Sequence, residues 1–200
     1  VMAATTELMF MPTGGFSPAV ENNHCSTLSS WGSATIGDPE LNGGLVITRN
    51  MDLPIEDYSH EQYNLTIHYP EEADELNWVN ISFVPGFISI ASAVNEKGYS
   101  IFTNDGSYIA GNETSNLYPT QLSKRNCIEL ADGNGDGNYD LNDYLWQRDQ
   151  HNYLYPSILT CASPDSAVIL ETYNGGATQR GTADNTVING TNLAATNHFR

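Results

Sequence analysis

Residues 24–52 read HCSTLSSWGSATIGDPELNGGLVITRNMD, and both ends of this stretch have the composition of β-strands. The run that begins at Cys25 and the run that ends at Asp52 are rich in Ser, Thr, Val and Ile, and the segment GDPELNGG between them is typical of a turn. We therefore predict a β-hairpin with Cys25 at its start. Such a hairpin brings Cys25 beside Arg49 and Asp52, where a charged pair can position and activate a thiol.

The motifs in and around this hairpin resemble those of a known enzyme family. Cys-Ser-Thr-Leu from Cys25, then Trp-Gly-Ser-Ala-Thr, then Thr-Arg-Asn-Met-Asp up to Asp52 are similar to the start of the mature cysteine-type N-terminal nucleophile (Ntn) hydrolases. The resemblance is strongest to the isopenicillin N acyltransferase (acyl-CoA:6-aminopenicillanic acid acyltransferase) group. Bile salt hydrolase, penicillin V acylase and acid ceramidase-like amidases are more distant. NEKGYSIFTNDG at 95–106 and AATNHF at 194–199 fit the same pattern in the same order.

The resemblance implies a role for each residue of the predicted site. Cys25 is the expected nucleophile, with its own α-amino group as the base, and Arg49 and Asp52 are expected to hold the thiol and the amine. A buried structural cysteine and a weak surface Arg–Asp pair are the alternative interpretations. Asn104 and Asn197 are expected to donate amide N–H groups to an oxyanion, although Asn in these motifs can also be a turn residue.

The pattern along the rest of the chain predicts an α+β fold. Helices are expected at 117–130 and 141–155, on either side of an acidic, glycine-rich segment. Strands are expected at 63–70, in three runs between 78 and 105, at 166–173 and at 192–199. Strands followed by helices and strands again favour helices packed on a largely antiparallel sheet. The family resemblance implies the four-layer αββα sandwich of the Ntn hydrolases.

Length and charge limit the classes of protein that the chain can be. Its 200 residues suit one domain with a sizeable core. Seven Lys and Arg against 24 Asp and Glu give a net charge of −17, which disfavours a nucleic-acid or anionic-membrane partner. The sequence has no apolar run long enough for a transmembrane helix.

The two ends of the sequence carry further expectations from the resemblance. Residues 1–24 are expected to be a leader or pro-segment ahead of an Ntn-hydrolase-like domain at 25–200. In the family this segment is removed by self-cleavage, whereas His24 replaces the small residue often found before the nucleophile. The chain is therefore a precursor, a cleaved protein that retains its leader, or a member that does not cleave. The family pattern continues past its T-N-H motif, so we expect the fold to be completed by a second chain or a C-terminal remainder.

Cysteines and glycosylation motifs favour an exported, secreted protein. The chain has three cysteines, and the nucleophile role of Cys25 leaves Cys127 and Cys161 as the expected disulfide. Export is compatible with such a disulfide and with N-glycosylation. The four Asn-X-Ser/Thr motifs begin at Asn64, Asn80, Asn112 and Asn189.

A second chemical signal lies at 132–143, DGNGDGNYDLND, within a predicted insertion at about 125–150. Oxygen-bearing groups fall at the ligand positions of an EF-hand calcium loop, with Gly137 at the required turn position. The loop ends in Asp instead of Glu and resembles the single loops of dockerin modules; a solvated acidic turn is the alternative. The expected ligands of a structural Ca²⁺ are Asp132, Asn134, Asp136, Asn138, Asp140 and Asp143.

Together these features predict an exported amidase or acyltransferase that acts on a small amide substrate through a thioester at Cys25. The alternative is a calcium-stabilised, glycosylated extracellular structural or adhesion protein on a non-catalytic Ntn-hydrolase scaffold. The state of the N-terminus separates the two, because a mature chain that begins at Cys25 favours the enzyme.

Overall fold

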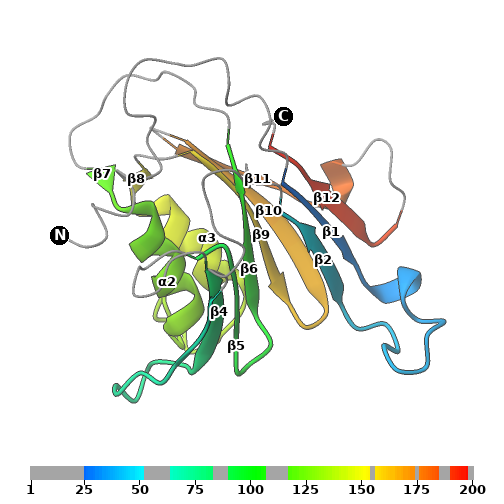
Figure 1. Cartoon of the computed structure of the whole chain (residues 1–200), viewed down its shortest axis with the longest axis horizontal. Helices are drawn as coiled ribbons and strands as arrows, with labels where there is room; N and C mark the ends of the chain where they lie inside the picture. The colour runs from blue at the N-terminus through cyan, green and yellow to red at the C-terminus, as the bar shows by residue number, and fades with distance from the viewer. Residues whose placement is uncertain are drawn as a thin grey trace.

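The computed structural model describes residues 25–51, 64–82, 90–106, 117–153, 156–173, 176–184 and 190–197. The expected leader, Asp52 and the sequons at Asn112 and Asn189 lie outside these ranges. Within them the chain forms two β-sheets that pack against each other and two α-helices that cover the far face of the larger sheet (Figure 1).

The larger sheet is antiparallel and has the strand order β11-β10-β9-β6-β5-β4-β3. Its strands are β3 (Asn64–His68), β4 (Trp78–Ser82), β5 (Ser92–Asn95), β6 (Ser100–Asp105), β9 (Ser157–Ser163), β10 (Ser166–Tyr173) and β11 (Gly176–Arg180). The smaller sheet has the order β12-β1-β2 and is also antiparallel. Its strands are β1 (Ser26–Ser30), β2 (Val46–Asn50) and β12 (Asn192–Ala195).

The helices α2 (Thr120–Glu129) and α3 (Leu141–Asp149) contact β5, β6, β9 and β11. A short parallel pair, β7 (Leu117–Tyr118) and β8 (Asn152–Tyr153), joins the chain before α2 to the chain after α3. Two 3-10 turns lie at Gly32–Ala34 and Thr182–Asp184. The predicted α+β fold, with helices on an antiparallel sheet, is therefore confirmed. The second predicted helix ends earlier than expected, because residues 152–153 belong to β8.

Two apolar cores hold these layers together. The first lies between the helices and the larger sheet; its buried residues are Trp78, Ile90, Ala93, Ile101, Cys127, Ile128, Tyr144, Leu159, Cys161 and Leu170. The second lies between the two sheets; its buried residues are Trp31, Ile158, Ala162, Ala167, Ile169, Leu193 and Ala195. The larger sheet is thus the central layer, buried on both faces where β9 and β10 pass.

Strand β9 shows why the sequence pattern missed one of the central strands. All seven of its residues are buried. Leu159 and Cys161 point into the first core, and Ile158 and Ala162 point into the second. A strand buried on both faces has no polar side, so its sequence lacks the alternation that marks a half-exposed strand.

The predicted hairpin is confirmed, with β1 and β2 paired from Ser26 opposite Asn50 to Ser30 opposite Val46. Gly43, at φ +88°, takes the left-handed conformation that its place in the connection requires. Its carbonyl oxygen accepts a hydrogen bond of 2.8 Å from the Gly32 amide, which closes the base of the connecting loop.

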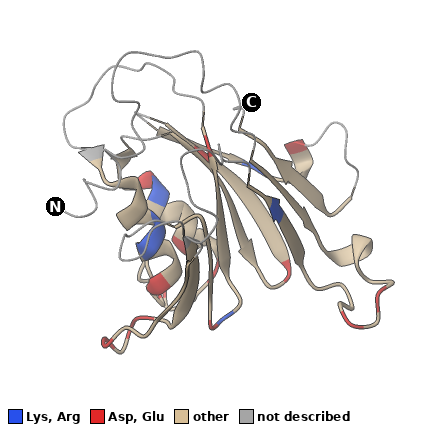
Figure 2. Ribbon diagram, viewed as in Figure 1, with Lys and Arg blue, Asp and Glu red and all other residues tan. Residues whose placement is uncertain are grey.

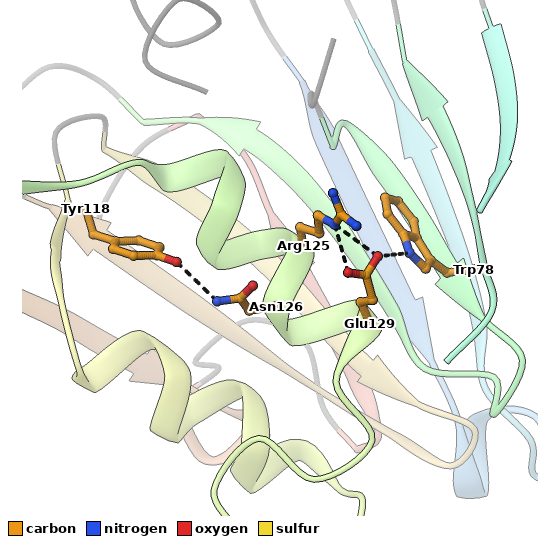
Figure 3. Close-up of polar contacts among 5 residues, drawn as sticks. All are labelled: Trp78, Tyr118, Arg125, Asn126 and Glu129. Carbon is orange, nitrogen blue, oxygen red and sulfur yellow. Dashed lines mark hydrogen bonds and ion pairs between the residues drawn. The ribbon is translucent and has the colours of Figure 1, made fainter. Parts of the chain in front are cut away.

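Glu129, at the end of α2, attaches this helix to the larger sheet. Its carboxylate accepts a hydrogen bond of 2.8 Å from Trp78 Nε1 on β4 and forms an ion pair of 2.8 Å with Arg125, one turn earlier (Figure 3). On the other side of the helix, Asn126 Nδ2 donates to the Tyr118 hydroxyl at 3.2 Å. Polar contacts therefore fix α2 against both β4 and β7.

Half of the basic side chains that the structure describes are buried. Lys124, Arg148 and Arg180 are buried and Arg49 is half-buried, whereas acidic side chains gather in the turns and loops (Figure 2). The negative charge of the chain is thus concentrated at the surface, which is unfavourable for binding nucleic acid or an anionic membrane.

The expected disulfide between Cys127 and Cys161 is wrong for this structure, which describes all three cysteines and contains no disulfide among them. Both side chains belong to the first core, Cys127 on α2 and Cys161 on β9. Burial raises the pKa of Cys127 to about 12 and the pKa of Cys161 well above its usual range. These residues behave as small apolar side chains, and the thiolate needed for disulfide exchange is strongly disfavoured.

One of the expected glycosylation sites is wrong, because its asparagine is buried. Asn80 is only 3% exposed in β4, where a glycan has no room. Asn64, on the edge strand β3, is partly exposed. Among the helices of the described residues, none is long and apolar enough to cross a membrane.

We predict that a thiol titration under denaturing, non-reducing conditions finds three thiols per chain. In the native protein, Cys127 and Cys161 should react far more slowly than after denaturation, because both are buried and protonated. A single titratable thiol in the denatured chain would instead show that the disulfide forms in solution.

Candidate active site

Cys25 lies directly before β1, with its side chain almost completely buried, and Arg49 lies on the neighbouring strand β2. The register places Arg49 opposite Thr27, two residues after Cys25. Arg49 Nη2 is 3.8 Å from Cys25 Sγ and donates a hydrogen bond to it. The sequence prediction that the hairpin brings these two residues together is confirmed. A guanidinium at this distance favours the thiolate form of the cysteine.

The Arg49 side chain crosses from the smaller sheet to the larger one. Nη1 donates to Ser92 Oγ on β5 at 3.4 Å and to Met51 Sδ at 2.8 Å, and Nη2 donates to the Thr103 carbonyl oxygen on β6. These contacts hold the guanidinium plane in one orientation beside the thiol. The exposed Arg–Asp pair, considered as an alternative for Arg49, does not describe this half-buried side chain.

Asn104 is completely buried within β6, so it is not a turn residue. Its Oδ1 accepts a hydrogen bond of 3.2 Å from the Thr27 hydroxyl, and this bond joins β6 to β1. Because Thr27 shares a strand face with Cys25, the bond places Asn104 in the same inter-sheet layer as the Cys25 thiol.

Asn197 follows β12, which is paired with β1 on the side opposite β2. The register sets Ala195 opposite Thr27, where the pairing of the two strands ends, and Asn197 is the second residue beyond it. Asn197 Nδ2 donates to the Asp105 carbonyl oxygen at 2.8 Å, which fixes its amide beside the end of β6. Cys25 thus precedes the middle strand of the smaller sheet, with Arg49 on one neighbouring strand and Asn197 after the other.

Asp105 is a titratable residue near the site that the sequence pattern did not single out. Burial raises the pKa of its carboxyl group, while the positive charges of Lys124 and Arg49 act in the opposite direction. Ser92 and Thr27 were missed as well, since each is a common residue within a strand. The one available signal was the spacing of Thr27, which places it on the same face of β1 as Cys25.

The expected calcium loop connects α2 to α3, and its side chains mostly bind its own backbone. Asp132 Oδ2 accepts from the Gly137 amide at 2.8 Å, and Gly137 has φ +85°, as the turn position requires. Asp143 instead caps α3 by accepting from the Asp140 amide at 2.8 Å. Among the residues that the structure describes, no three His, Cys, Asp or Glu side chains are gathered as a metal site needs.

The fold is similar to that of a solved amidase. The Caenorhabditis elegans ortholog of N-acylethanolamine-hydrolyzing acid amidase matches with a TM-score of 0.59 and 14% sequence identity, over 88% of this chain and 71% of that chain. No protein-family model and no curated protein matches the sequence. At this identity the likeness shows the fold alone. With the two packed sheets and the helical layer, it shows that the chain has an α+β sandwich of the same general fold as this amidase.

We predict that replacing Arg49 by Ala slows the alkylation of Cys25 by iodoacetamide in the native protein by about tenfold at neutral pH. The reason is the loss of a positive charge next to the sulfur, which disfavours the reactive thiolate. The rate is measured by mass spectrometry of the Cys25 peptide.

Thr48→Ala is the control for this measurement, because Thr48 precedes Arg49 on β2 but points outward and is exposed. Its alkylation rate should equal that of the unmodified protein. Equal rates for Arg49→Ala and Thr48→Ala would remove Arg49 from the activation of the thiol.

Proposed function

We propose that this chain is an amide hydrolase or acyltransferase whose nucleophile is the thiol of Cys25. The observation that carries the proposal is the contact of 3.8 Å between Arg49 Nη2 and Cys25 Sγ, at the start of the first strand of an Ntn-hydrolase sandwich. The buried amides of Asn104 and Asn197 in the same layer support it, since acyl transfer needs donors for a developing oxyanion.

In the proposed reaction, the Cys25 thiolate attacks the carbonyl carbon of an amide and forms a tetrahedral oxyanion. Asn104 and Asn197 are the proposed donors to this oxyanion, and Arg49 stabilises the thiolate before attack. The α-amino group of Cys25, free once the bond to His24 is cleaved, takes the thiol proton and delivers it to the leaving amine. Water, or a second amine, then releases the acyl group from the thioester. Asp52 is proposed to hold the α-amino group.

The substrate class we propose is an N-acyl amide with an apolar acyl chain. Ser92, which accepts from Arg49, lies opposite Ile81 on β4, and Ile81 lies opposite Leu65 on β3. Directly paired residues share one face of a sheet, and both Ile81 and Leu65 are exposed. An acyl chain that is bound at Cys25 and extends along this row would lie on an apolar surface. The similar nematode protein is named for hydrolysing N-acylethanolamines, which are amides of this general kind.

We predict that an N-acyl amide adds the mass of its acyl group to the Cys25 peptide of the mature protein, and that Cys25→Ser abolishes both this adduct and turnover. Serine is a far poorer nucleophile than cysteine when only a weak base is available. In a series of straight acyl chains, kcat/KM should rise by about fourfold for each methylene that is buried on the apolar row.

Turnover by Cys25→Ser comparable with that of the unmodified protein would contradict the role of Cys25. An intact chain that retains residues 1–24 and forms no acyl adduct would favour the second candidate function. That candidate is a calcium-stabilised, glycosylated extracellular scaffold without catalysis. Both candidates include export, which we propose on the acidity of the chain and its sequons.

We also propose that residues 132–143 bind Ca²⁺ as a structural ion. Hydrogen bonds from Asn138 and Asn134 favour the charged form of Asp136 and hold its pKa below its usual range. Carboxylates this close together repel one another, and a cation relieves the repulsion. Asp132, Asp136 and Asp143 would turn from backbone amides toward the ion, with Asn134, Asn138 and Asp140 completing the ligand set.

We predict that chelation of calcium lowers the melting temperature by about 5 to 10 °C. An ion that binds only the folded loop stabilises the protein by about 2.7 kcal/mol at a hundredfold excess over its dissociation constant. Asp136→Ala should reproduce the loss, whereas Asp149→Ala should not, because Asp149 is an exposed carboxylate outside the loop. Identical melting curves with calcium and with excess chelator would exclude the site.

A further inference from the structure

The hydrogen bond between Thr27 and Asn104 sets which end of the Asn104 amide faces which neighbour. The Thr27 hydroxyl donates to Oδ1 at 3.2 Å, and both side chains are buried. An amide has an acceptor end and a donor end that occupy similar volumes, so sterics alone do not choose between its two orientations. A hydroxyl that donates a hydrogen bond to the acceptor end selects one of the two orientations.

The donor end of Asn104 has no acceptor of its own in the described part of the protein. Nδ2 is buried, and no described atom accepts a hydrogen bond from it. A buried amide donor without an acceptor costs stability, so its retention indicates a partner that arrives later. A substrate oxygen that becomes negatively charged is such a partner.

Asn104 also lies next to the group that holds the nucleophile. Arg49 Nη2 donates both to Cys25 Sγ and to the carbonyl oxygen of Thr103, the residue before Asn104. Thr27 is two residues after Cys25, so the two side chains lie on one face of β1, with Cα atoms about 7 Å apart. The donor that Thr27 orients is thus part of the layer in which the thiol lies.

We propose that Thr27 is a positioning residue for the reaction at Cys25, because its hydroxyl keeps the N–H groups of Asn104 available for the oxyanion. This inference rests on the proposed function. Without the hydroxyl, the Asn104 amide can rotate by half a turn, and its carbonyl oxygen then occupies the place of Nδ2. An oxygen there repels the developing negative charge that the nitrogen would stabilise.

Strand β1 itself provides a comparison residue for this role. Ser29 follows Thr27 on the same face and is completely buried, and in the described structure its hydroxyl has no hydrogen-bond partner. A hydroxyl on this face is therefore not sufficient; only the one at position 27 reaches Asn104. Ser29→Ala removes a buried hydroxyl from the same strand without touching the amide.

The test compares Thr27→Val, Thr27→Ser and Ser29→Ala with the unmodified mature protein, using an N-acyl amide and, separately, iodoacetamide. Thr27→Val has the same shape without the hydroxyl and should lower kcat by about 10- to 100-fold with little change in KM. Thr27→Ser keeps the hydroxyl and should remain within about threefold, and Ser29→Ala should have the unmodified kcat. Alkylation forms no oxyanion, so all three variants should alkylate Cys25 at the unmodified rate.

An Asn104→Ala background completes the test. If Thr27 acts through Asn104, adding Thr27→Val to Asn104→Ala should change kcat by less than about twofold, because the two losses are not additive. Multiplicative losses, an unchanged kcat for Thr27→Val, or equal slowing of alkylation and acylation would each overturn the positioning role while leaving Cys25 as the nucleophile. No acyl adduct on the unmodified protein would overturn the proposed function and this inference together.

Discussion

The guanidinium of Arg49 is where the two sheets and the Cys25 thiol meet. It extends from β2 of the smaller sheet, and its donors reach the Cys25 sulfur, Ser92 on β5 and the Thr103 carbonyl on β6. A guanidinium carries its donors in one rigid plane, so these contacts set the position of the thiol relative to the larger sheet. A lysine ammonium, with rotating donors at a single point, could not hold all three. The packing of the sheets at this end and the chemistry of the thiol therefore depend on the same side chain.

The larger sheet, which Arg49 contacts, is rigid because it is buried on both faces at its centre. Strands β9 and β10 send alternate side chains into the helix–sheet core and the sheet–sheet core. Strand β6, which carries Thr103 and Asn104, is paired with β9 along its length. Groups held on such strands keep their orientation better than groups on loops, which suits the role proposed for Asn104.

Burial changes the meaning of the sequence features that favour export. Cys127 and Cys161 are on elements that pack together, yet each is a thiol within an apolar core. Asn80 begins a glycosylation motif but lies in β4, with 3% of its surface exposed. Cysteine counts and tripeptide motifs are local, whereas the accessibility that gives them meaning depends on elements distant in the sequence.

The sequence by itself determined the hairpin of Cys25 and Arg49, both helices and the α+β class, because turn residues, strand composition and helical periodicity are local properties. Local spacing also places Thr27 on the face of Cys25. Only the tertiary structure revealed the central strand β9, because burial on both faces removes the alternation of polar and apolar residues. Only the tertiary structure showed which of its two orientations the Asn104 amide takes. The orientation of the amide is set by the hydroxyl of Thr27, which is 77 residues away in the chain. Contacts between strands that pair in different sheets leave no periodic trace in a sequence, so the bond of Thr27 to Asn104 and the contacts of Arg49 to β5 and β6 became apparent only in the packed structure.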